Sequence, residues 1–327
     1  MIITKTPFRI SFCGGGSDIS TFYREHGGCV ISTSINRYMY ISIHPYFTEG
    51  RTALKYSKTE IVDDLKSIEH SIFKCVLNEK KIAGVEITST ADVPSGTGLG
   101  SSSAFTVGLL HTLYCYQGKY VSKADIAAEA CRIEIEKLGN PIGKQDQYAA
   151  ACGGLNFISF NKDDSVMVEP IIMQQETKQE LQDNIVIFYT GITHDANQIL
   201  AEQKKNISED DKTKNLIRMC NLAREMKSAL EHDELSDFGE ILNEGWMKKK
   251  ELASGIANPQ IDEMYDRAMS IGASGGKLLG AGGGGFLLFY CEKENQKKLI
   301  EGMGLRQFPV RFEHDGTSVV YIGDKYW

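Results

Sequence analysis

The sequence predicts an α+β protein with about two domains. Its 327 residues exceed the usual length of a single domain. Segments with alternating apolar residues dominate the first third, whereas helical spacing of apolar residues dominates the second half. The two kinds of segment do not alternate regularly, as they would in a doubly wound parallel sheet. We expect the junction in the polar segment 161–180, which gives the domains 1–170 and 171–327.

The first strands are predicted by apolar alternation and by the residues that interrupt it. Alternation over 8–12 ends at three consecutive glycines, and alternation over 39–43 ends near Pro45. The segment 85–90, rich in β-branched residues, predicts a third strand, which ends before Pro94.

Helices are predicted next along the chain. From Ser101 onward, apolar residues recur at intervals of four, as on one face of a helix. Ser122 and Asp125 resemble a capping box at the start of a second helix, and Gly139 is a suitable residue just beyond its end. A short helix rich in alanine is expected to begin near Asp146.

The second half reads as a strand, three helices and another strand. The apolar segment 185–189 predicts a buried strand. The expected helices cover 216–230, 238–252 and 261–269, and the apolar segment 286–290 predicts a strand that follows a run of glycines.

Composition excludes several classes of protein. The net charge is −7 and no basic stretch occurs, which argues against nucleic acid as the main partner. The eight cysteines form no CxxC and the histidines form no metal-binding pattern, so we expect no zinc site. No signal peptide and no long apolar run are recognisable, so we expect a cytoplasmic protein without a membrane partner.

Three glycine-rich segments, 14–16, 96–100 and 280–285, are candidate sites. The middle one follows a strand and leads through Ser101, Ser102 and Ser103 into a helix. Small residues let a phosphate approach the backbone, and a helix N-terminus supplies unpaired N–H donors. The alternative is an ordinary turn with a serine cap. Gly96, Gly98 and Gly100 are therefore candidate phosphate-binding residues.

Better-known glycine motifs do not fit their required context. No GxxxxGK[ST] occurs. The GxGxxG within 280–285 precedes a predicted strand, whereas a dinucleotide site needs it after a strand. The GxSxG within 272–276 follows a helical pattern and is better explained as a glycine-rich helix end than as a hydrolase motif.

Glu134 is the most informative single residue. On a helical wheel it lies with Cys131 and Leu138 in the apolar stripe, whereas Glu129 and Glu136 lie on the polar face. A carboxylate directed at a core is costly unless a cation or hydrogen-bond donors meet it. Glu134 is therefore either a ligand of a metal or substrate, or one half of a buried ion pair.

Two other charged residues are weaker candidates when taken alone. Asp146 lies in the first turn of its expected helix, where the helix dipole favours any acid. Arg9 lies on the strand face opposite Phe8 and Ile10, where a surface or inter-strand cation is the plain alternative.

Three motifs together resemble those of the GHMP kinases, the group of galactokinase, homoserine kinase and mevalonate kinase. The segment 94–104, PSGTGLGSSSA, resembles the family's P-x-x-x-G-L-G-S-S-A motif. The segment 6–14, TPFRISFCG, resembles the N-terminal motif, and 277–285, KLLGAGGGG, resembles the C-terminal glycine motif. The three motifs lie in the family's order and span most of the chain.

The resemblance implies a fold and an activity. The fold is an N-terminal domain like ribosomal protein S5 domain 2 and a ferredoxin-like C-terminal domain. The activity is phosphoryl transfer from ATP, with Mg²⁺ as cofactor. The loop from Gly96 to Ser103 would hold the ATP phosphates, Asp146 and Arg9 would be catalytic, and Glu134 and Ser102 would bind the metal.

The resemblance also indicates a sugar or sugar-phosphate substrate. Asp18 aligns with an acid that binds sugar hydroxyls, and Gly282 and Gly283 belong to a motif near the substrate. Galactokinases carry Glu and His where Gly15 and Gly16 stand here, so two sugar contacts are missing and galactose is in doubt.

The chain is similar to a bacterial subgroup containing D-glycero-α-D-manno-heptose 7-phosphate kinases and related sugar 1-kinases. Its product would be the 1,7-bisphosphate, on the way to GDP-heptose. Lys144 and Arg37 are candidate ligands of the substrate phosphate, with a surface charge as the alternative for each. An L-fucose- or galactose-type 1-kinase and a non-catalytic sugar sensor are the rival predictions. A homodimer stays open.

Overall fold

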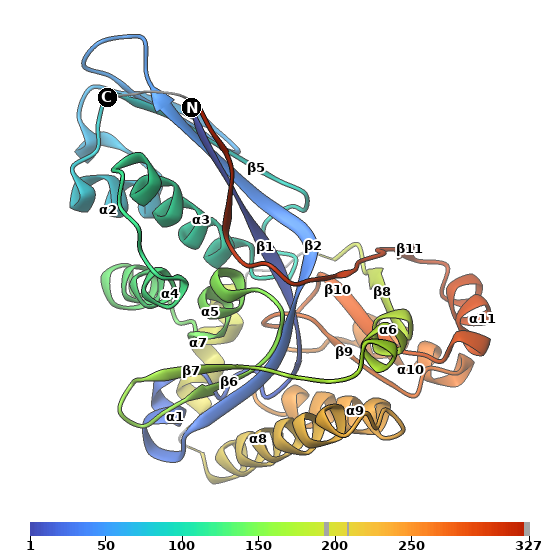
Figure 1. The fold of residues 1–327 in the computed structure, drawn as a ribbon. Coiled ribbons are helices and arrows are strands. Elements are labelled where there is room, and N and C mark those ends of the chain that lie inside the picture. The colour runs from blue at the N-terminus through green and yellow to red at the C-terminus, as the bar shows by residue number, and fades with distance from the viewer. Residues whose placement is uncertain (193–195, 208, 324–327) are drawn as a thin grey trace.

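The computed structural model describes residues 1–192, 196–207 and 209–323, and these contain two β-sheets (Figure 1). In these residues the larger sheet has nine strands, six of them in the order β13-β1-β2-β5-β3-β4. Those six are β1 (Ile2–Cys13), β2 (Gly28–Pro45), β3 (Thr52–Lys55), β4 (Thr59–Val62), β5 (Val85–Ala91) and β13 (Ser318–Ile322). The remaining three are β6 (Leu155–Phe160), β7 (Val166–Pro170) and β12 (Phe312–Glu313). β6 and β12 pair with β2, and β7 pairs with β6.

β1 confirms the predicted alternation and positions the site. Phe8, Ile10 and Phe12 are fully or almost fully buried in the core. Successive residues of a strand point to opposite faces, so the alternate residues Arg9 and Ser11 face the other way, into a cleft. The strand pairs with β2 along nearly its whole length, which holds Arg9 firmly in register opposite Ser34.

The smaller sheet has the order β11-β8-β10-β9. Its strands are β11 (Arg306–Gln307), β8 (Ile185–Tyr189), β10 (Phe286–Tyr290) and β9 (Gly275–Leu278). The central strands β8 and β10 are the two apolar segments of the second half, so both predictions are confirmed. They are antiparallel, with Leu288 opposite Ile187.

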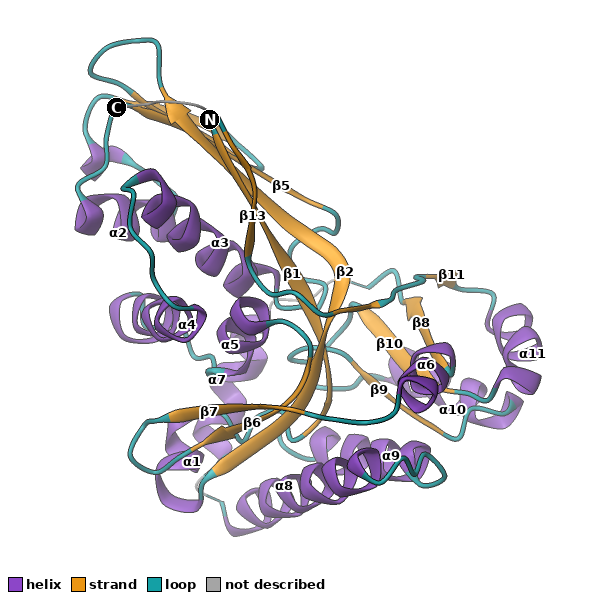
Figure 2. Ribbon diagram, viewed as in Figure 1, coloured by secondary structure: helices purple, strands orange, loops and turns teal. Residues whose placement is uncertain are grey.

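Helices cover both sheets (Figure 2). They are α1 (Ser20–His26), α2 (Ser71–Lys80), α3 (Ser101–Tyr116), α4 (Lys123–Cys131), α5 (Gln145–Cys152), α6 (Gln175–Asp183), α7 (Ala196–Asn206), α8 (Asp210–Glu231), α9 (Phe238–Lys250), α10 (Pro259–Ile271) and α11 (Lys293–Met303), with a short 3₁₀ turn, η1 (Leu65–Ser67). Figure 2 shows α2 to α5 along one side of the larger sheet, and α8 and α9 beneath its lower end. No helix of the described segments is long and apolar enough to cross a membrane.

The predicted ends of the helix around Glu134 are confirmed. The Ser122 hydroxyl accepts a hydrogen bond from the Asp125 N–H at 3.1 Å, and Gly139 adopts a positive φ of 69° just after the helix. The helical path continues from α4 through a π-helical stretch, η2 (Arg132–Lys137), which the apolar spacing did not predict. Such stretches are frequent at functional sites.

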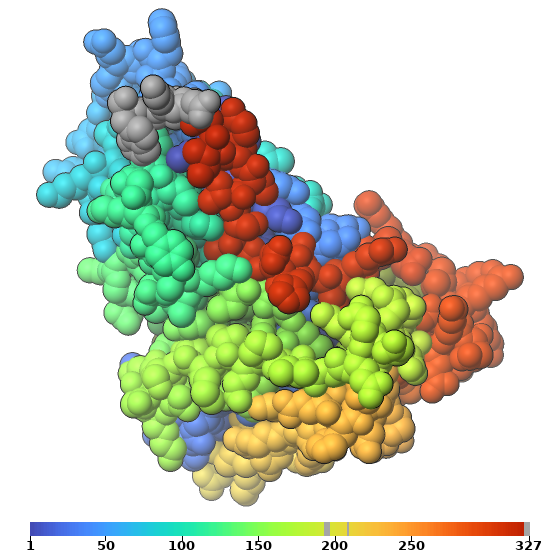
Figure 3. Space-filling view, in the orientation of Figure 1, coloured from blue at the N-terminus to red at the C-terminus, as the bar shows by residue number. Residues whose placement is uncertain are grey.

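The end of the chain returns to the larger sheet. β13 pairs with β1 in an antiparallel register, and β12 pairs with β2. Figure 3 shows these C-terminal residues packed along the N-terminal strand. The division into 1–170 and 171–327 stays a prediction, and the described segment 312–322 belongs to the sheet of the first half.

Candidate functional site

A polar cleft of about 380 Å³ lies where the glycine-rich segments come together. Its walls come from the end of β1 and the turn after it, the loop before α3, the start of α5, helices α7 and α9, and the loop before β10. Segments far apart in sequence therefore build one site, and the predicted phosphate-binding and catalytic residues line it.

The loop before α3 has the geometry of a phosphate-binding loop. Gly96, Gly98 and Gly100 all have positive φ, between 75° and 84°, which suits glycine. α3 begins directly after Gly100, so the N–H groups at its start have no partner within the helix. Ser101, Ser102 and Ser103 also line the cleft. This is a suitable cradle for an anionic phosphate.

Two glycine loops pack backbone against backbone. A Cβ atom on Gly98 would lie 2.4 Å from the carbonyl oxygen of Leu279, and a Cβ on Gly280 would lie 2.4 Å from the Cα of Gly98. A Cβ on Gly285 would lie 2.3 Å from the Thr97 carbonyl oxygen. Glycine is required at these positions because any side chain would push the loops apart.

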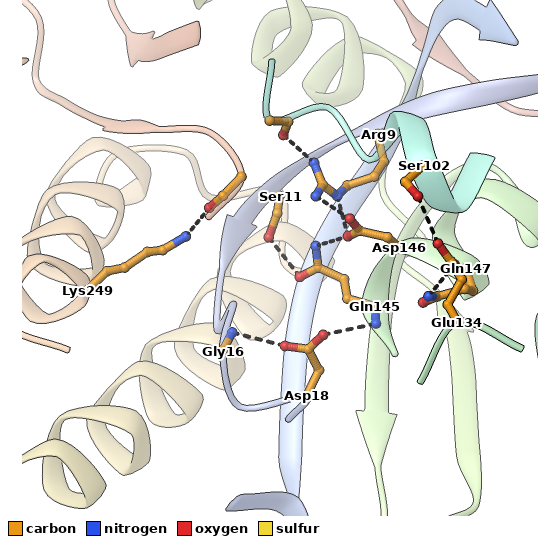
Figure 4. A network of polar contacts seen from close by, with 12 residues as sticks. Arg9, Ser11, Gly16, Asp18, Ser102, Glu134, Gln145, Asp146, Gln147 and Lys249 are labelled. Atoms are coloured by element: carbon orange, nitrogen blue, oxygen red, sulfur yellow. Dashed lines mark hydrogen bonds and ion pairs between the residues drawn. The ribbon is translucent and has the colours of Figure 1, made fainter. Parts of the chain in front are cut away.

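Arg9 and Asp146 form a two-point ion pair at the centre of the cleft (Figure 4). The Arg9 Nε and Nη2 atoms donate to the two carboxylate oxygens of Asp146, each at 2.7 Å. Nη1 donates to the carbonyl of Gly98 at 2.7 Å. The Arg9 side chain is 6% exposed and that of Asp146 28% exposed, so the carboxylate reaches the open cleft. The plain alternatives for Arg9 and Asp146 do not describe this arrangement.

Asp18 organises the far side of the ion pair. Its carboxylate accepts from the backbone N–H groups of Gly16 and Gln145, both at 3.0 Å. Gln145 in turn donates to Asp146 at 3.1 Å, so Asp18 and Asp146 belong to one network. Burial raises the pKa of Asp18, an effect that the Gln145 N–H opposes and the charge of Asp146 reinforces. A Cβ on Gly143 would collide with Asp18, which explains the glycine there.

Glu134 is fully buried, as the helical wheel predicted, and hydrogen-bond donors rather than a cation meet it. Ser102 Oγ lies 3.0 Å from Oε1, and Gln147 donates to Oε2 at 2.8 Å. Burial raises the pKa of Glu134, and its donors oppose that shift. No ion pair of Glu134 occurs among the described residues, so they do not support the ion-pair alternative. Its role as a metal ligand stays a prediction.

The residues fit a magnesium ion bound together with nucleotide phosphates. Mg²⁺ commonly uses one or two carboxylates plus substrate phosphates and waters. Here the Glu134 carboxylate lies directly behind the Ser102 hydroxyl, at the start of the phosphate-binding helix. Glu134 itself does not line the cleft, so Ser102 is the nearer of the two predicted ligands.

Gly15 and Gly16 lie in the cleft wall, but the space beside them differs. A Cβ on Gly15 would make only ordinary contacts, at 3.7 Å from Gln145 and Ser11. A Cβ on Gly16 would lie 2.2 Å from the side-chain nitrogen of Gln203 in α7. The space that opens at Gly16 is therefore filled by a glutamine, a residue that the sequence did not single out.

Two buried lysines also line the cleft and were not predicted as site residues. Lys249 of α9 is 6% exposed and donates to the carbonyl of Gly280. Burial, reinforced by the charge of Arg9, lowers the pKa of Lys249 to about 8. Lys277 of β9 is 4% exposed and donates to the carbonyl of Phe12 at 3.0 Å, and burial lowers its pKa as well.

The structure does not bring the other predicted cations into this cleft. Arg37 donates to the carbonyls of Asn36 and Pro309 and stacks on Phe308. Lys144 points into a neighbouring cavity of about 320 Å³, where it donates to the Asp164 carbonyl at 2.9 Å. The phosphate-binding role expected of both residues is therefore not supported by their positions.

The two glycines predicted from the C-terminal motif differ in their position relative to the cleft. Gly282 lines the cleft with a φ of 122°. Gly283 does not line it, and its N–H donates to the carbonyl of Ile256 at 3.0 Å. Of the two, only Gly282 is placed for substrate contact.

Family models match both halves of the chain. Residues 66–154 match the GHMP kinases N-terminal domain, and residues 226–309 match the GHMP kinases C-terminal model. The chain is 30% identical over 319 residues to the D-glycero-alpha-D-manno-heptose 7-phosphate kinase of Campylobacter jejuni, with 94% of each chain covered. It is 25% identical to the galactokinase of Pyrococcus furiosus, covering 95% of this chain and 94% of that protein.

Solved structures agree. A D-glycero-D-manno-heptose 1-phosphate kinase from Bacteriodes thetaiotaomicron has a TM-score of 0.81 and 26% identity, covering 99% of this chain and 100% of that one. The galactokinase of Lactococcus lactis, at 18% identity and a TM-score of 0.77, shows the same fold.

The fold, the glycine loop and the paired arginine and aspartate define a phosphotransferase of the GHMP type. The chain belongs to the GHMP kinase family, and the predicted α+β fold is confirmed. It is an ATP-dependent kinase with an alcohol group as phosphoryl acceptor.

Proposed function

We propose that this kinase phosphorylates the anomeric hydroxyl of a sugar, with D-glycero-α-D-manno-heptose 7-phosphate as substrate and the 1,7-bisphosphate as product. The product would serve the synthesis of GDP-heptose for surface polysaccharide. The full-length similarity to the Campylobacter jejuni heptose 7-phosphate kinase supports this substrate. Within the molecule, the Arg9–Asp146 pair supports the proposal most directly, because it lies beside the glycine loop and is open to the cleft.

Asp146 orients the acceptor in this proposal. Its carboxylate accepts a hydrogen bond from the anomeric hydroxyl, which directs an oxygen lone pair at the γ-phosphorus of ATP. The new O–P bond forms as the bond to the β,γ-bridging oxygen breaks, and ADP leaves. The hydroxyl proton passes to Asp146 and then to solvent. Positioning and charge neutralisation supply most of the catalysis in reactions of this type.

Arg9 and the glycine loop offset the charge of the moving phosphoryl group. Arg9 holds Asp146 with two hydrogen bonds and the loop carbonyl of Gly98 with a third, so one side chain fixes the distance between acceptor and donor sites. The N–H groups at the start of α3 are preorganised donors for the phosphates. Bound Mg²⁺, held by Glu134 and Ser102, would neutralise phosphate charge.

A sugar panel tests the proposal. ADP release from Mg-ATP would be measured with heptose 7-phosphate, mannose, L-fucose and galactose. We expect by far the highest kcat/KM with the heptose 7-phosphate. Turnover on an unphosphorylated sugar alone would keep the anomeric chemistry but reject the substrate. ATP binding without turnover on any of these sugars would reject all four as substrates and favour an untested substrate or the sensor.

A fucose-type 1-kinase is the second candidate. The L-fucokinase/L-fucose-1-P guanylyltransferase of Bacteroides fragilis is 31% identical over 86% of this chain. That match covers only 34% of the larger protein. The same panel separates the two candidates, because fucose carries no phosphate. The cytoplasmic location and a homodimer stay predictions.

A further inference from the structure

We propose that Gln203 and Lys249 form a subsite for an anionic group on the acceptor, so that the enzyme selects a sugar that already carries a phosphate. The inference rests on the proposed sugar kinase activity and names the residues and the charge that define its substrate. It does not use Lys144 or Arg37, which lie outside the cleft.

The side chain of Gln203 lies in the wall of the cleft beside Gly16. Gln203 is 2% exposed, lines the cleft from α7, and its side-chain nitrogen has no hydrogen-bond acceptor among the described residues. A buried donor without an acceptor is costly. The neighbouring Gly16 has no side chain that could meet the amide, and its carbonyl accepts from the Ile19 N–H instead. A ligand oxygen in the cleft would supply the missing acceptor.

Gln203 lies on the acceptor side of the reacting centre. A continuous set of contacts runs from the Gly98 carbonyl through Arg9, Asp146 and Gln145 to Asp18 and then to Gly16 (Figure 4). The phosphate-binding loop lies at one end of this network, and Gln203 lies against Gly16 at the other. Asp146 stands between them. A sugar whose anomeric hydroxyl meets Asp146 would therefore extend toward Gln203.

Lys249 brings a positive charge into the same cleft. Its ammonium group has three donors, of which the Gly280 carbonyl accepts one. Among the described residues, no carboxylate lies within 4.0 Å of Lys249 or of Lys277, whereas Arg9 is paired with Asp146. Lysine is rarely buried without a partner. In the part of the chain that the structure describes, the cleft is thus lined by three cations, Arg9 included, and by two carboxylates, Asp18 and Asp146.

The Gln203 amide lacks an acceptor and the buried Lys249 ammonium lacks a carboxylate partner among the described residues. The same kind of ligand would satisfy both groups. A phosphate has several acceptor oxygens and a charge of nearly −2 at neutral pH, so it would satisfy both groups. The ATP phosphates already have the glycine loop and the start of α3. Lys249 is also close enough to Asp18 and Asp146 for their charges to act on it, so the second phosphate is assigned to the acceptor.

Variants with matched controls test the subsite. Lys249→Met removes the charge and keeps the length of the side chain, and Lys248→Met makes the same change on the same helix outside the cleft. Gln203→Leu removes the amide, and Gln198→Leu is its exposed control in α7. Thermal unfolding of each variant shows whether it folds. KM would be measured for ATP and for a sugar with and without its phosphate, using heptose 7-phosphate and the heptose, or mannose 6-phosphate and mannose.

We expect Lys249→Met to raise the KM for the phosphorylated sugar about 10- to 100-fold, as for a lost hydrogen bond to a charged group. Gln203→Leu should raise it roughly 5-fold or more. The KM for ATP and for the unphosphorylated sugar should stay within about twofold of wild type, and both controls should behave as wild type. Lys249→Arg should restore part of the affinity.

Several results would overturn the subsite. If Lys249→Met raises the KM equally for both sugars, or raises the KM for ATP, then Lys249 binds the nucleotide phosphates instead. A wild-type enzyme that shows no preference for the phosphorylated sugar would also overturn the subsite. Turnover of no sugar at all would reject the proposed function instead. The affinity of the sugar phosphate for the wild type and for Lys249→Met would then be measured by calorimetry. Equal affinities would overturn the subsite.

Discussion

Arg9 and Asp146 lie 137 positions apart in sequence and are joined by two parallel hydrogen bonds of 2.7 Å. This pair links β1 to the first turn of α5, and its third contact, to Gly98, links both to the phosphate-binding loop. Planar, two-point pairing fixes the orientation of a carboxylate as well as its position. Arg9 therefore fixes the orientation of the Asp146 carboxylate relative to the glycine loop, and Gln145 adds one further hydrogen bond to it.

Asp146→Asn tests the role of the carboxylate. The amide keeps the shape but loses the charge, and its NH₂ group would face the Arg9 donors. We expect kcat to fall about 1000-fold, within the range for a lost general base, while ATP still binds. ADP release and nucleotide binding would be measured in parallel. Asp163→Asn, an exposed change outside the cleft, is the control, and wild-type turnover in Asp146→Asn would contradict the role.

Glu134→Gln tests the predicted metal ligand. Glutamine has the size of glutamate and can still accept from Ser102, so the fold should be kept. We expect the Mg²⁺ concentration for half-maximal activity to rise roughly tenfold, as when metal coordination is weakened. An Mg²⁺ curve that coincides with the wild type would show that Glu134 only supports the glycine loop.

The same substitution has a pH-dependent effect on stability. Burial raises the pKa of Glu134 in the folded protein, so the folded state binds this proton more tightly than the unfolded chain does. The contribution of the protonated acid is present below the unfolded pKa of about 4.3 and is lost as the pH rises through the folded value. The Tm of Glu134→Gln minus that of the wild type should therefore increase from about pH 4 to pH 7. A constant difference would contradict the shift.

Gly98→Ala and Gly96→Ala separate backbone strain from loop contact. Both glycines have similar positive φ, so both substitutions should cost about 1–2 kcal/mol in strain. Gly98→Ala also forces a Cβ toward the Leu279 carbonyl, whereas nothing lies within 4 Å of a Cβ on Gly96. Chemical denaturation should show a clearly larger loss for Gly98→Ala. Equal losses would mean that the two glycine loops separate easily.

Lys249 should give the affinity for a sugar phosphate an upper pH limit. Burial and the charge of Arg9 lower the pKa of Lys249 to about 8, against the opposing carboxylates of Asp18 and Asp146, while the nearby Lys277 adds a further positive charge. The sugar phosphate is a dianion above about pH 6. Its KM should therefore be lowest between these values and should rise at higher pH as Lys249 loses its proton. Lys249→Arg should remove this rise, because arginine stays protonated. A rise that persists in that variant would exclude Lys249 as its cause.

Local patterns in the sequence predicted most of the site. Alternation in β1 separates Arg9 from the buried Phe8 and Ile10, and helical spacing puts Glu134 among apolar residues. Both signals arise from short-range geometry, which a sequence displays directly. The location of the domain junction and of the returning β12 and β13 depends on pairings between distant segments, for which local patterns give no signal.

The cleft residues that the sequence did not predict do not differ from their neighbours in any local pattern. Lys249 stands in a run of three lysines at the end of α9, which is typical of a solvated helix C-terminus, and only the tertiary contacts bury the middle one. Gln203 lies in a polar segment of α7 and is buried only because Gly16 leaves room for it. Lys144 precedes α5 by one residue, and its side chain lines the neighbouring cavity although Asp146 is only two positions away.

The pairing of β13 with β1 bears on how the protein is made. β1 carries Arg9, but the partner that covers its other edge is formed from residues 318–322, which are made long after β1 and β2. A nascent chain that has folded β1 against β2 therefore still exposes an unpaired strand edge over Ile2–Lys5. Such edges recruit foreign strands. Until residues 318–322 have been made, the edge of β1 that carries Ile2–Lys5 is therefore open to pairing with strands of other chains.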